Sequence, residues 1–156
     1  MLKVTIPGAK VLVLEHIVLD YNGTMALDGG LIPGVEKRLN LLAKLLQVHI
    51  ITADTFGFCR DACRDIKARI HILNATRGGP EKEGYIETLD AEKVVAIGNG
   101  ANDALMLARA ALGIAVIGPE GTAARALQAA DIITRDINTA LDMLLNPKRL
   151  TATLRL

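Results

Sequence analysis

The chain has 156 residues, of which 51% are hydrophobic and 3% aromatic, a composition that fits one domain with an aliphatic core. Its 18 Lys and Arg residues nearly balance 17 Asp and Glu residues, and the net charge of +1 gives no reason to expect binding to nucleic acid or a membrane surface. No apolar run approaches the roughly 20 residues of a membrane span, and the start is too short and strand-like for a signal peptide. We therefore expect a single cytoplasmic domain over residues 1–156.

Short apolar runs alternate with segments of helical periodicity along the chain. Residues 4–6 and 11–14 are predicted to pair as a hairpin across Pro7-Gly8, and a buried strand over 17–19 ends at Asp20. The next predicted elements are a helix over 35–46, a strand over 48–51, a helix over 57–68, a strand over 70–73 and a helix over 81–89 that begins after Pro80. Then follow a strand over 94–97, a helix over 103–110, a strand over 113–117, a helix over 122–129, a strand over 132–133 and a helix over 138–145.

This alternation predicts an α/β fold of three layers, Rossmann-like, in which helices cover both faces of a central, mainly parallel sheet and the hairpin forms an N-terminal extension. Ligands of such sheets bind at the carboxyl ends of the strands. Cys59 and Cys63 lie four residues apart in a helical-looking stretch, and we interpret them as two half-buried thiols on one face of that helix. The histidines His16, His49 and His71 share no motif and are expected to be structural.

Polar residues stand at three of the predicted strand ends. Asp20 closes a buried strand, and the glycine in the loop that follows lets several backbone N–H groups face one anion. Thr52 ends a second strand, and a glycine-rich turn over residues 98–103 opens a helix whose N-terminus favours an anion. Lys82 adds a positive charge at the start of another helix. Each feature alone is common, but the order of the four is far more specific.

In that order the four features resemble the motifs of the haloacid dehalogenase (HAD) superfamily. The family's DxDGT matches Asp20-Tyr21-Asn22-Gly23-Thr24, its strand-end Thr matches Thr52, its Lys matches Lys82, and its GDGxND matches Gly98-Asn99-Gly100-Ala101-Asn102-Asp103. The stretch over 94–133 looks especially like the phosphorylation domain of P-type ATPases. Over nearly its whole length the chain resembles the soluble, P-type-ATPase-like phosphatases of this superfamily.

The resemblance implies a phosphatase in which Asp20 attacks phosphorus and becomes an aspartyl-phosphate, with Mg²⁺ as cofactor. Asp20, Asn22, Thr52 and Lys82 are the implied catalytic residues. The implied metal ligands are Asp20, the backbone carbonyl of Asn22, Asn99 and Asp103. The phosphate would be held by Tyr21, Asn22, Gly23, Thr24, Thr52, Ala53, Lys82 and Asn102.

Two positions depart from the family pattern. Many family phosphatases have Asp as general acid and base where this chain has Asn22, and an amide exchanges no proton at neutral pH, so we predict slow hydrolysis limited by dephosphorylation of Asp20. Asn99 replaces a metal-binding Asp, which predicts weaker Mg²⁺ binding or direct recruitment of Asp103. The same two changes leave open an inactive HAD-fold binding module that serves a partner. A detached piece of an ion pump and a dehalogenase fit the sequence less well.

Neither gap between the motifs can hold a cap domain, because residues 24–52 are accounted for by a hairpin-like flap over 25–33 and one helix, and residues 52–82 by a helix, a strand and a loop. Asp28-Gly29-Gly30 is predicted to form the turn of this flap, and Asp54 to cap the next helix or line the site. We expect an open site that accepts a phosphorylated small molecule or macromolecule, or a site closed by a second subunit. A mean hydropathy of +0.32 slightly favours the homo-oligomer.

Overall fold

The structure is a computed structural model, and it describes residues 1–54, 57–74 and 78–156. A six-stranded, fully parallel sheet forms its centre, with the strand order β10-β9-β8-β3-β6-β7. The strands are β3 (His16–Asp20), β6 (Gln47–Thr52), β7 (Arg69–Ile72), β8 (Val94–Gly98), β9 (Leu112–Val116) and β10 (Ile132–Thr134). This confirms the parallel sheet predicted from the alternation of strands and helices.

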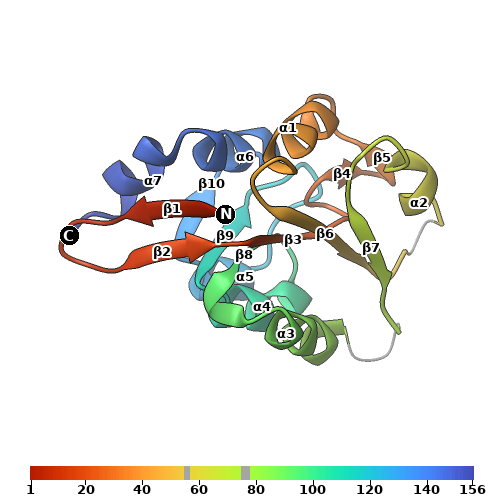
Figure 1. The fold of residues 1–156 in the computed structure, drawn as a ribbon. Helices are drawn as coiled ribbons and strands as arrows, with labels where there is room; N and C mark the ends of the chain where they lie inside the picture. The colour runs from red at the N-terminus through yellow and green to blue at the C-terminus, as the bar shows by residue number, and fades with distance from the viewer. Residues whose placement is uncertain (55–56, 75–77) are drawn as a thin grey trace.

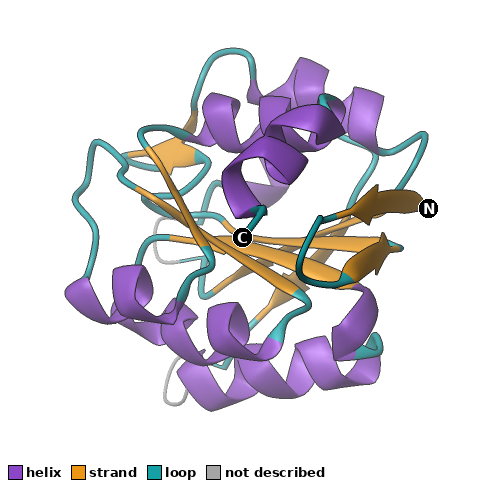
Figure 2. Cartoon of the chain, turned by 90° about the vertical axis from the view of Figure 1, so that its left-hand side faces the viewer, coloured by secondary structure: helices purple, strands orange, loops and turns teal. Residues whose placement is uncertain are grey.

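Helices cover both faces of the sheet (Figures 1 and 2). One layer contains α1 (Val35–Leu42), α6 (Ile137–Leu145) and α7 (Pro147–Leu154), and the other contains α3 (Gly78–Thr88), α4 (Ala104–Arg109) and α5 (Ala124–Ala129). Successive residues of a strand face opposite layers, so in β3 Ile17 and Leu19 pack in the first core and Val18 packs in the second. The fold is therefore the three-layer α/β arrangement expected from the sequence.

Two small hairpins flank the central sheet. The predicted N-terminal hairpin is present as β1 (Leu2–Thr5) paired antiparallel with β2 (Val11–Leu14), and α7 packs against β1. The flap over residues 25–33 contains β4 (Ala26–Leu27) and β5 (Gly30–Leu31), and Asp28 and Gly29 form its turn with positive φ angles of 51° and 82°. Two short 3-10 helices, η1 (Ala91–Lys93) and η2 (Ala101–Asp103), precede β8 and α4.

Some predicted helices differ from the observed ones. The helix expected over 57–68 is only the single turn α2 (Cys59–Ala62), and the side chain of Asn40 binds the backbone of Asp65 and Lys67 in the irregular segment that follows. Because these tertiary hydrogen bonds satisfy the backbone, no helix continues there. Cys59 and Cys63 are buried rather than half-buried. Helix α1 ends before the predicted residue 46, and α7 was not predicted from the sequence.

The three histidines lie together, although they share no sequence motif. On the α3 side of the sheet, His49 is fully buried, its Nε2 lies 3.1 Å from Nδ1 of His16, and its Nδ1 lies 2.9 Å from the hydroxyl of Tyr85. The ring of His71 packs against Tyr85 with its centroid 4.8 Å away. These contacts satisfy the buried imidazole and hold α3 against the sheet. In the described residues, no helix is both long enough and apolar enough to cross a bilayer.

Candidate active site

The predicted polar strand ends meet because β3 lies between β6 and β8, so the carboxyl ends of these three strands are neighbours. Asp20 is the last residue of β3, and Lys82 reaches it from the first turns of α3. The Lys82 Nζ lies 2.6 Å from Asp20 Oδ1 and 2.6 Å from Asp103 Oδ1. One ammonium group therefore bridges two carboxylates that are distant in sequence.

All three charged side chains of this bridge are buried. The side chains of Lys82 and Asp103 are 1% and 0% exposed, and that of Asp20 is 11% exposed. Burial and, next, the charge of Asp103 raise the pKa of Asp20 to about 7, although Lys82 and Thr24 act in the opposite direction. For Lys82, burial alone would lower the pKa, but the two carboxylates outweigh it and raise the pKa. The cluster thus has one more carboxylate than cations and favours an additional positive charge.

The loop after Asp20 is a tight turn, in which the N–H groups of Met25 and Ala26 both donate to the Tyr21 carbonyl. Gly23 has a φ of +77°, and a Cβ at this position would lie 2.5 Å from the Asn99 Nδ2 atom. Only glycine combines this conformation with so close a contact. The motif glycine is therefore explained by the packing of the Asp20 loop against the turn that carries Asn99.

Thr24 connects these two loops. Its hydroxyl lies 3.1 Å from Asp20 Oδ2 and 3.0 Å from Asn99 Oδ1. The amide of Asn99 donates from Nδ2 to the Gly121 carbonyl, and the Ala123 N–H donates to the Asn99 carbonyl. The segment after β9 therefore fixes the orientation of Asn99, a support that no sequence signal indicated.

Asp103 organises the turn between β8 and α4. Its Oδ2 accepts from the N–H groups of Asn99 at 2.9 Å and Gly100 at 2.8 Å, while its Oδ1 accepts from Lys82. Gly98 is required beside it, because a Cβ there would lie 2.5 Å from the Asp103 carboxyl carbon. Both Asp103 oxygens are thus bound by protein donors, so the immediate partner of this carboxylate is Lys82.

Thr52 and Asn22 face each other across the site. The Asn22 Nδ2 lies 3.5 Å from the Thr52 hydroxyl, which also accepts from the Asp54 N–H at 2.9 Å. The Asn22 Oδ1 is buried and has no hydrogen-bond partner among the described residues. Asp54 also accepts from the Cys59 N–H at the start of α2 through Oδ1, although the N-cap residue of this helix is Phe58. The unpaired amide oxygen marks a place where a donor from a ligand would be stabilised.

The remaining predicted site residues lie further from the charged cluster. The Tyr21 side chain points into the flap, where its hydroxyl donates to the Gly29 carbonyl at 2.7 Å, so only its backbone belongs to the Asp20 loop. Ala53 is exposed beside Thr52, and Asn102 is exposed beside Gly78 at the start of α3. Among the described residues, none of these three side chains forms a hydrogen bond with Asp20 or Lys82.

The described residues contain no group of three or more His, Cys, Asp or Glu side chains that could hold a metal ion. The oxygen donors that the structure brings together are instead the Asp20 carboxylate and the Asn99 amide, both within hydrogen-bond distance of the Thr24 hydroxyl. Hard cations such as Mg²⁺ are bound through oxygen, commonly with only one or two carboxylates. The excess buried negative charge and the all-oxygen donor set therefore fit Mg²⁺.

Comparison of the sequence with known proteins gives a match to a family model and a match to an individual protein. Residues 86–140 match the model of the haloacid dehalogenase-like hydrolases, a range that includes the turn with Asn99 and Asp103. An uncharacterized protein of Methanocaldococcus jannaschii is 55% identical over 64 residues, which are 41% of this chain and 69% of that protein.

Solved structures with the same fold include a putative HAD superfamily (subfamily III A) hydrolase from Legionella pneumophila, with a TM-score of 0.72, 17% identity and coverage of 90% of this chain and 87% of that one. A 3-deoxy-D-manno-octulosonate 8-phosphate phosphatase from Moraxella catarrhalis, in complex with magnesium, phosphate and the sugar acid, has a TM-score of 0.68 and 17% identity, with coverage of 89% and 90%. A zinc-transporting PIB-type ATPase matches 78% of this chain and 20% of its own length, with a TM-score of 0.63 and 23% identity. At these identities the likenesses establish the fold alone.

Proposed function

The chain belongs to the haloacid dehalogenase-like hydrolases, and from this premise we propose that it is a Mg²⁺-dependent phosphatase that acts through an aspartyl-phosphate on Asp20. The observation that carries the proposal is the Lys82 ammonium held 2.6 Å from both Asp20 and Asp103 at the carboxyl edge of the sheet. A buried carboxylate beside a fixed cation suits attack on a phosphate dianion, because the cation stabilises charge on the transferred group.

The proposed step begins when a carboxylate oxygen of Asp20 forms a bond to phosphorus as the bond between phosphorus and the ester oxygen breaks. The alcohol leaves and takes a proton from water. Water then attacks phosphorus of the aspartyl-phosphate. Inorganic phosphate and one proton are released, and the Asp20 carboxylate is regenerated. The hydroxyl of Thr52, Lys82 and the backbone N–H groups of the Asp20 loop would hold the phosphoryl oxygens, with Ala53 and Asn102 at the margin of the site.

Mg²⁺ would supply positive charge opposite the phosphoryl oxygens when bound. The Asp20 carboxylate, the Asn22 carbonyl and the Asn99 amide would hold it, while Asp103 would contribute its charge through Lys82. The Asn99 amide carries no charge and is a weaker ligand than a carboxylate at that position, so we expect weaker Mg²⁺ binding than with aspartate there. The likeness to a magnesium-bound phosphatase of the same fold supports this assignment.

Slow turnover is part of the proposal. Asn22 occupies the position from which a general base would activate water, and such catalysis typically contributes about 10²- to 10⁴-fold. Its Oδ1 is buried and unpaired among the described residues, so it can orient a water molecule without accepting its proton. We therefore expect the aspartyl-phosphate to accumulate during turnover.

The test is hydrolysis of p-nitrophenyl phosphate with and without Mg²⁺, by the parent and by Asp20→Asn. Acid-quenched samples analysed by mass spectrometry should contain a phosphoryl group on the peptide with Asp20 in the parent alone. Metal-dependent turnover that Asp20→Asn abolishes supports the proposal. Equal rates for the two proteins at stoichiometric enzyme, without a phosphorylated peptide, would refute it and favour a non-catalytic binding module on the same fold.

A further inference from the structure

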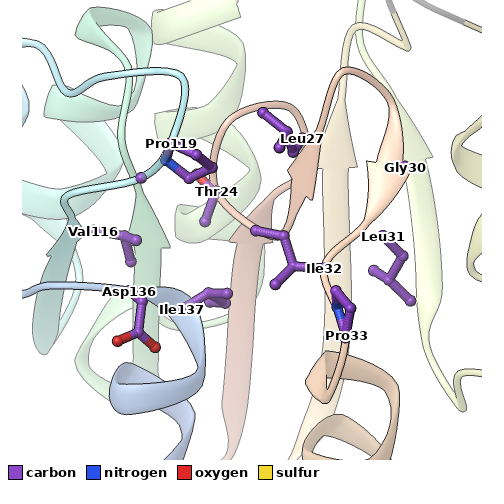
Figure 3. A pocket seen from close by; sticks show the side chains of 11 residues that line it. Thr24, Leu27, Gly30, Leu31, Ile32, Pro33, Val116, Pro119, Asp136 and Ile137 are labelled. Carbon is purple, nitrogen blue, oxygen red and sulfur yellow. The ribbon is translucent and has the colours of Figure 1, made fainter.

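A pocket of about 470 Å³ lies between the flap and the loop after β9 (Figure 3). Thr24 forms part of its wall, and the hydroxyl of that residue is 3.1 Å from the Asp20 carboxylate. The volume falls in the range of small-molecule sites, about 300–1,000 Å³. A molecule in this pocket would therefore contact the flap and lie one side chain away from the nucleophile.

The pocket wall is almost entirely aliphatic. Leu27, Leu31 and Ile32 of the flap face Val116 and Ile137 across it (Figure 3). Burial of a hydroxyl or charged group against such a wall without a partner costs about 1–3 kcal/mol or more. The pocket therefore selects for apolar groups.

The polar side chains that line the pocket are already paired. The Thr24 hydroxyl contacts Asp20 and Asn99. The Asp136 carboxylate accepts from the Thr139 N–H through Oδ1 and from the Thr139 hydroxyl through Oδ2. The residues that line this pocket include no Lys, Arg or His, and Asp136 is negatively charged. An acidic sugar, such as the octulosonate of the Moraxella enzyme, would find no cation here and one repelling carboxylate.

Exposed apolar side chains extend this preference to the rim of the site. Leu27 in the flap, Phe58 before α2 and Ile117 after β9 are 43%, 57% and 49% exposed. Single exposed hydrophobic residues are normal. These three, however, lie in the segments that follow the carboxyl ends of β3, β6 and β9, and Asp20 is the last residue of β3. In-line attack places the leaving oxygen on the side of phosphorus opposite to Asp20, away from the end of β3.

We propose that the substrate is a phosphate monoester of an uncharged, aliphatic or aromatic alcohol, whose apolar group packs between the flap and the loop after β9. This inference rests on the proposed phosphatase function and adds the class of leaving group. Lys82 and the Asp20 loop bind the phosphate, and the apolar walls bind the alcohol. Sugar phosphates and other polyhydroxylated esters are poor substrates.

The experiment measures kcat/KM for straight-chain alkyl phosphates from methyl to octyl phosphate, together with glycerol phosphate and 3-deoxy-D-manno-octulosonate 8-phosphate. All are esters of alcohols, so the slope with chain length reports contacts of the alkyl group. Burial of one methylene contributes about 0.8 kcal/mol, which is about fourfold in kcat/KM. We expect a rise of this order for each of the first few methylenes, followed by a plateau when the pocket is full.

Leu27→Ser should lower the ratio of octyl to methyl phosphate kcat/KM about threefold or more, since it removes apolar area from the flap. Leu45→Ser is the matched control, because Leu45 is 44% exposed but follows α1 at the opposite edge of the sheet, and its ratio should equal that of the parent. A flat series, or a preference for glycerol or octulosonate phosphate, would overturn the inference and leave the phosphatase proposal intact. Absence of Asp20-dependent turnover with every ester would overturn the phosphatase proposal itself.

Discussion

Replacement of Lys82 by Met tests the buried ion bridge without reference to catalysis. Methionine retains most of the side-chain length but removes the charge that lies 2.6 Å from both Asp20 and Asp103. Two carboxylates then remain buried without their cation. Loss of one partner from a buried ion pair typically costs about 3–5 kcal/mol, and we expect the free energy of unfolding to fall by that amount at pH 8.

The loss should depend on pH in a defined direction. Burial already raises the pKa of Asp20 to about 7, and the loss of Lys82 removes a charge that lowers it, so the folded chain binds more protons than the unfolded chain between the unfolded value near 4 and the folded value. The stability of Lys82→Met is therefore greatest at acidic pH and decreases as pH rises through the folded-state pKa of Asp20. Relative to the parent, the variant should lose less at pH 5 than at pH 8.

Urea unfolding followed by circular dichroism at both pH values measures this difference. The double variant Asp20→Asn with Lys82→Met should recover part of the loss at pH 8, because one of the two uncompensated charges is absent. A loss below about 1 kcal/mol at pH 8, or an equal loss at both pH values, would show that Lys82 does not bridge two buried charges.

Three further predictions address other parts of the site and core. Burial, followed by the charges of His16 and Arg69, lowers the pKa of His49 to about 4, whereas the unfolded chain protonates near pH 6.5; the stability of the parent relative to His49→Gln should therefore fall by about 2 kcal/mol between pH 7 and pH 5 in the same urea titrations, since the variant lacks this titration and both proteins share that of Asp20. Asn22→Asp should increase the rate of aspartyl-phosphate breakdown by about 10²- to 10⁴-fold at saturating Mg²⁺ in a rapid-quench assay, and an unchanged rate would show that this position does not serve as a base. Gly23→Ala should cost more than about 2 kcal/mol because its Cβ meets Asn99, whereas Gly121→Ala, with a similar positive φ of 90° but no described atom within 4 Å of its Cβ, should cost about 1–2 kcal/mol.

The sequence predicted those parts of the fold that depend on local pattern. Apolar runs such as residues 17–19 and 94–97 are buried strands, and the polar residues that follow them meet at one edge because parallel strands share their direction. The periodicity of residues 57–68 suggested a long helix, but side-chain hydrogen bonds from Asn40 replace the helical ones after Ala62. Contacts between segments so distant in sequence leave no local pattern, and this is why the helix was overestimated.

The same distinction applies to the site. Glycines at positions 23 and 98 could be predicted from motif spacing, since each permits one close backbone approach. The double contact of Lys82 could not, because it depends on where α3 lies relative to β3 and β8. The cluster of His16, His49 and Tyr85 was also missed, since its members come from two strands and one helix with no common motif. Residue identity indicates which groups are available, whereas pairing requires the tertiary arrangement.

The two amides at positions 22 and 99 also limit the negative charge in the buried site. With Asp20, Asp103 and Lys82 ionised, the cluster has a net charge of −1, and aspartate at both amide positions would make it −3. A site with more uncompensated buried charge depends more on a divalent cation for its stability than the present one does. Asn99 is 9% exposed and its Oδ1 is 3.0 Å from the Thr24 hydroxyl, so Asn99→Asp places a new charge among buried groups. We expect this variant to melt at a lower temperature than the parent in chelator and to gain more from Mg²⁺, because tighter binding to the folded state stabilises it by mass action. Equal Mg²⁺-induced shifts in melting temperature for parent and variant would show that residue 99 does not contact the metal.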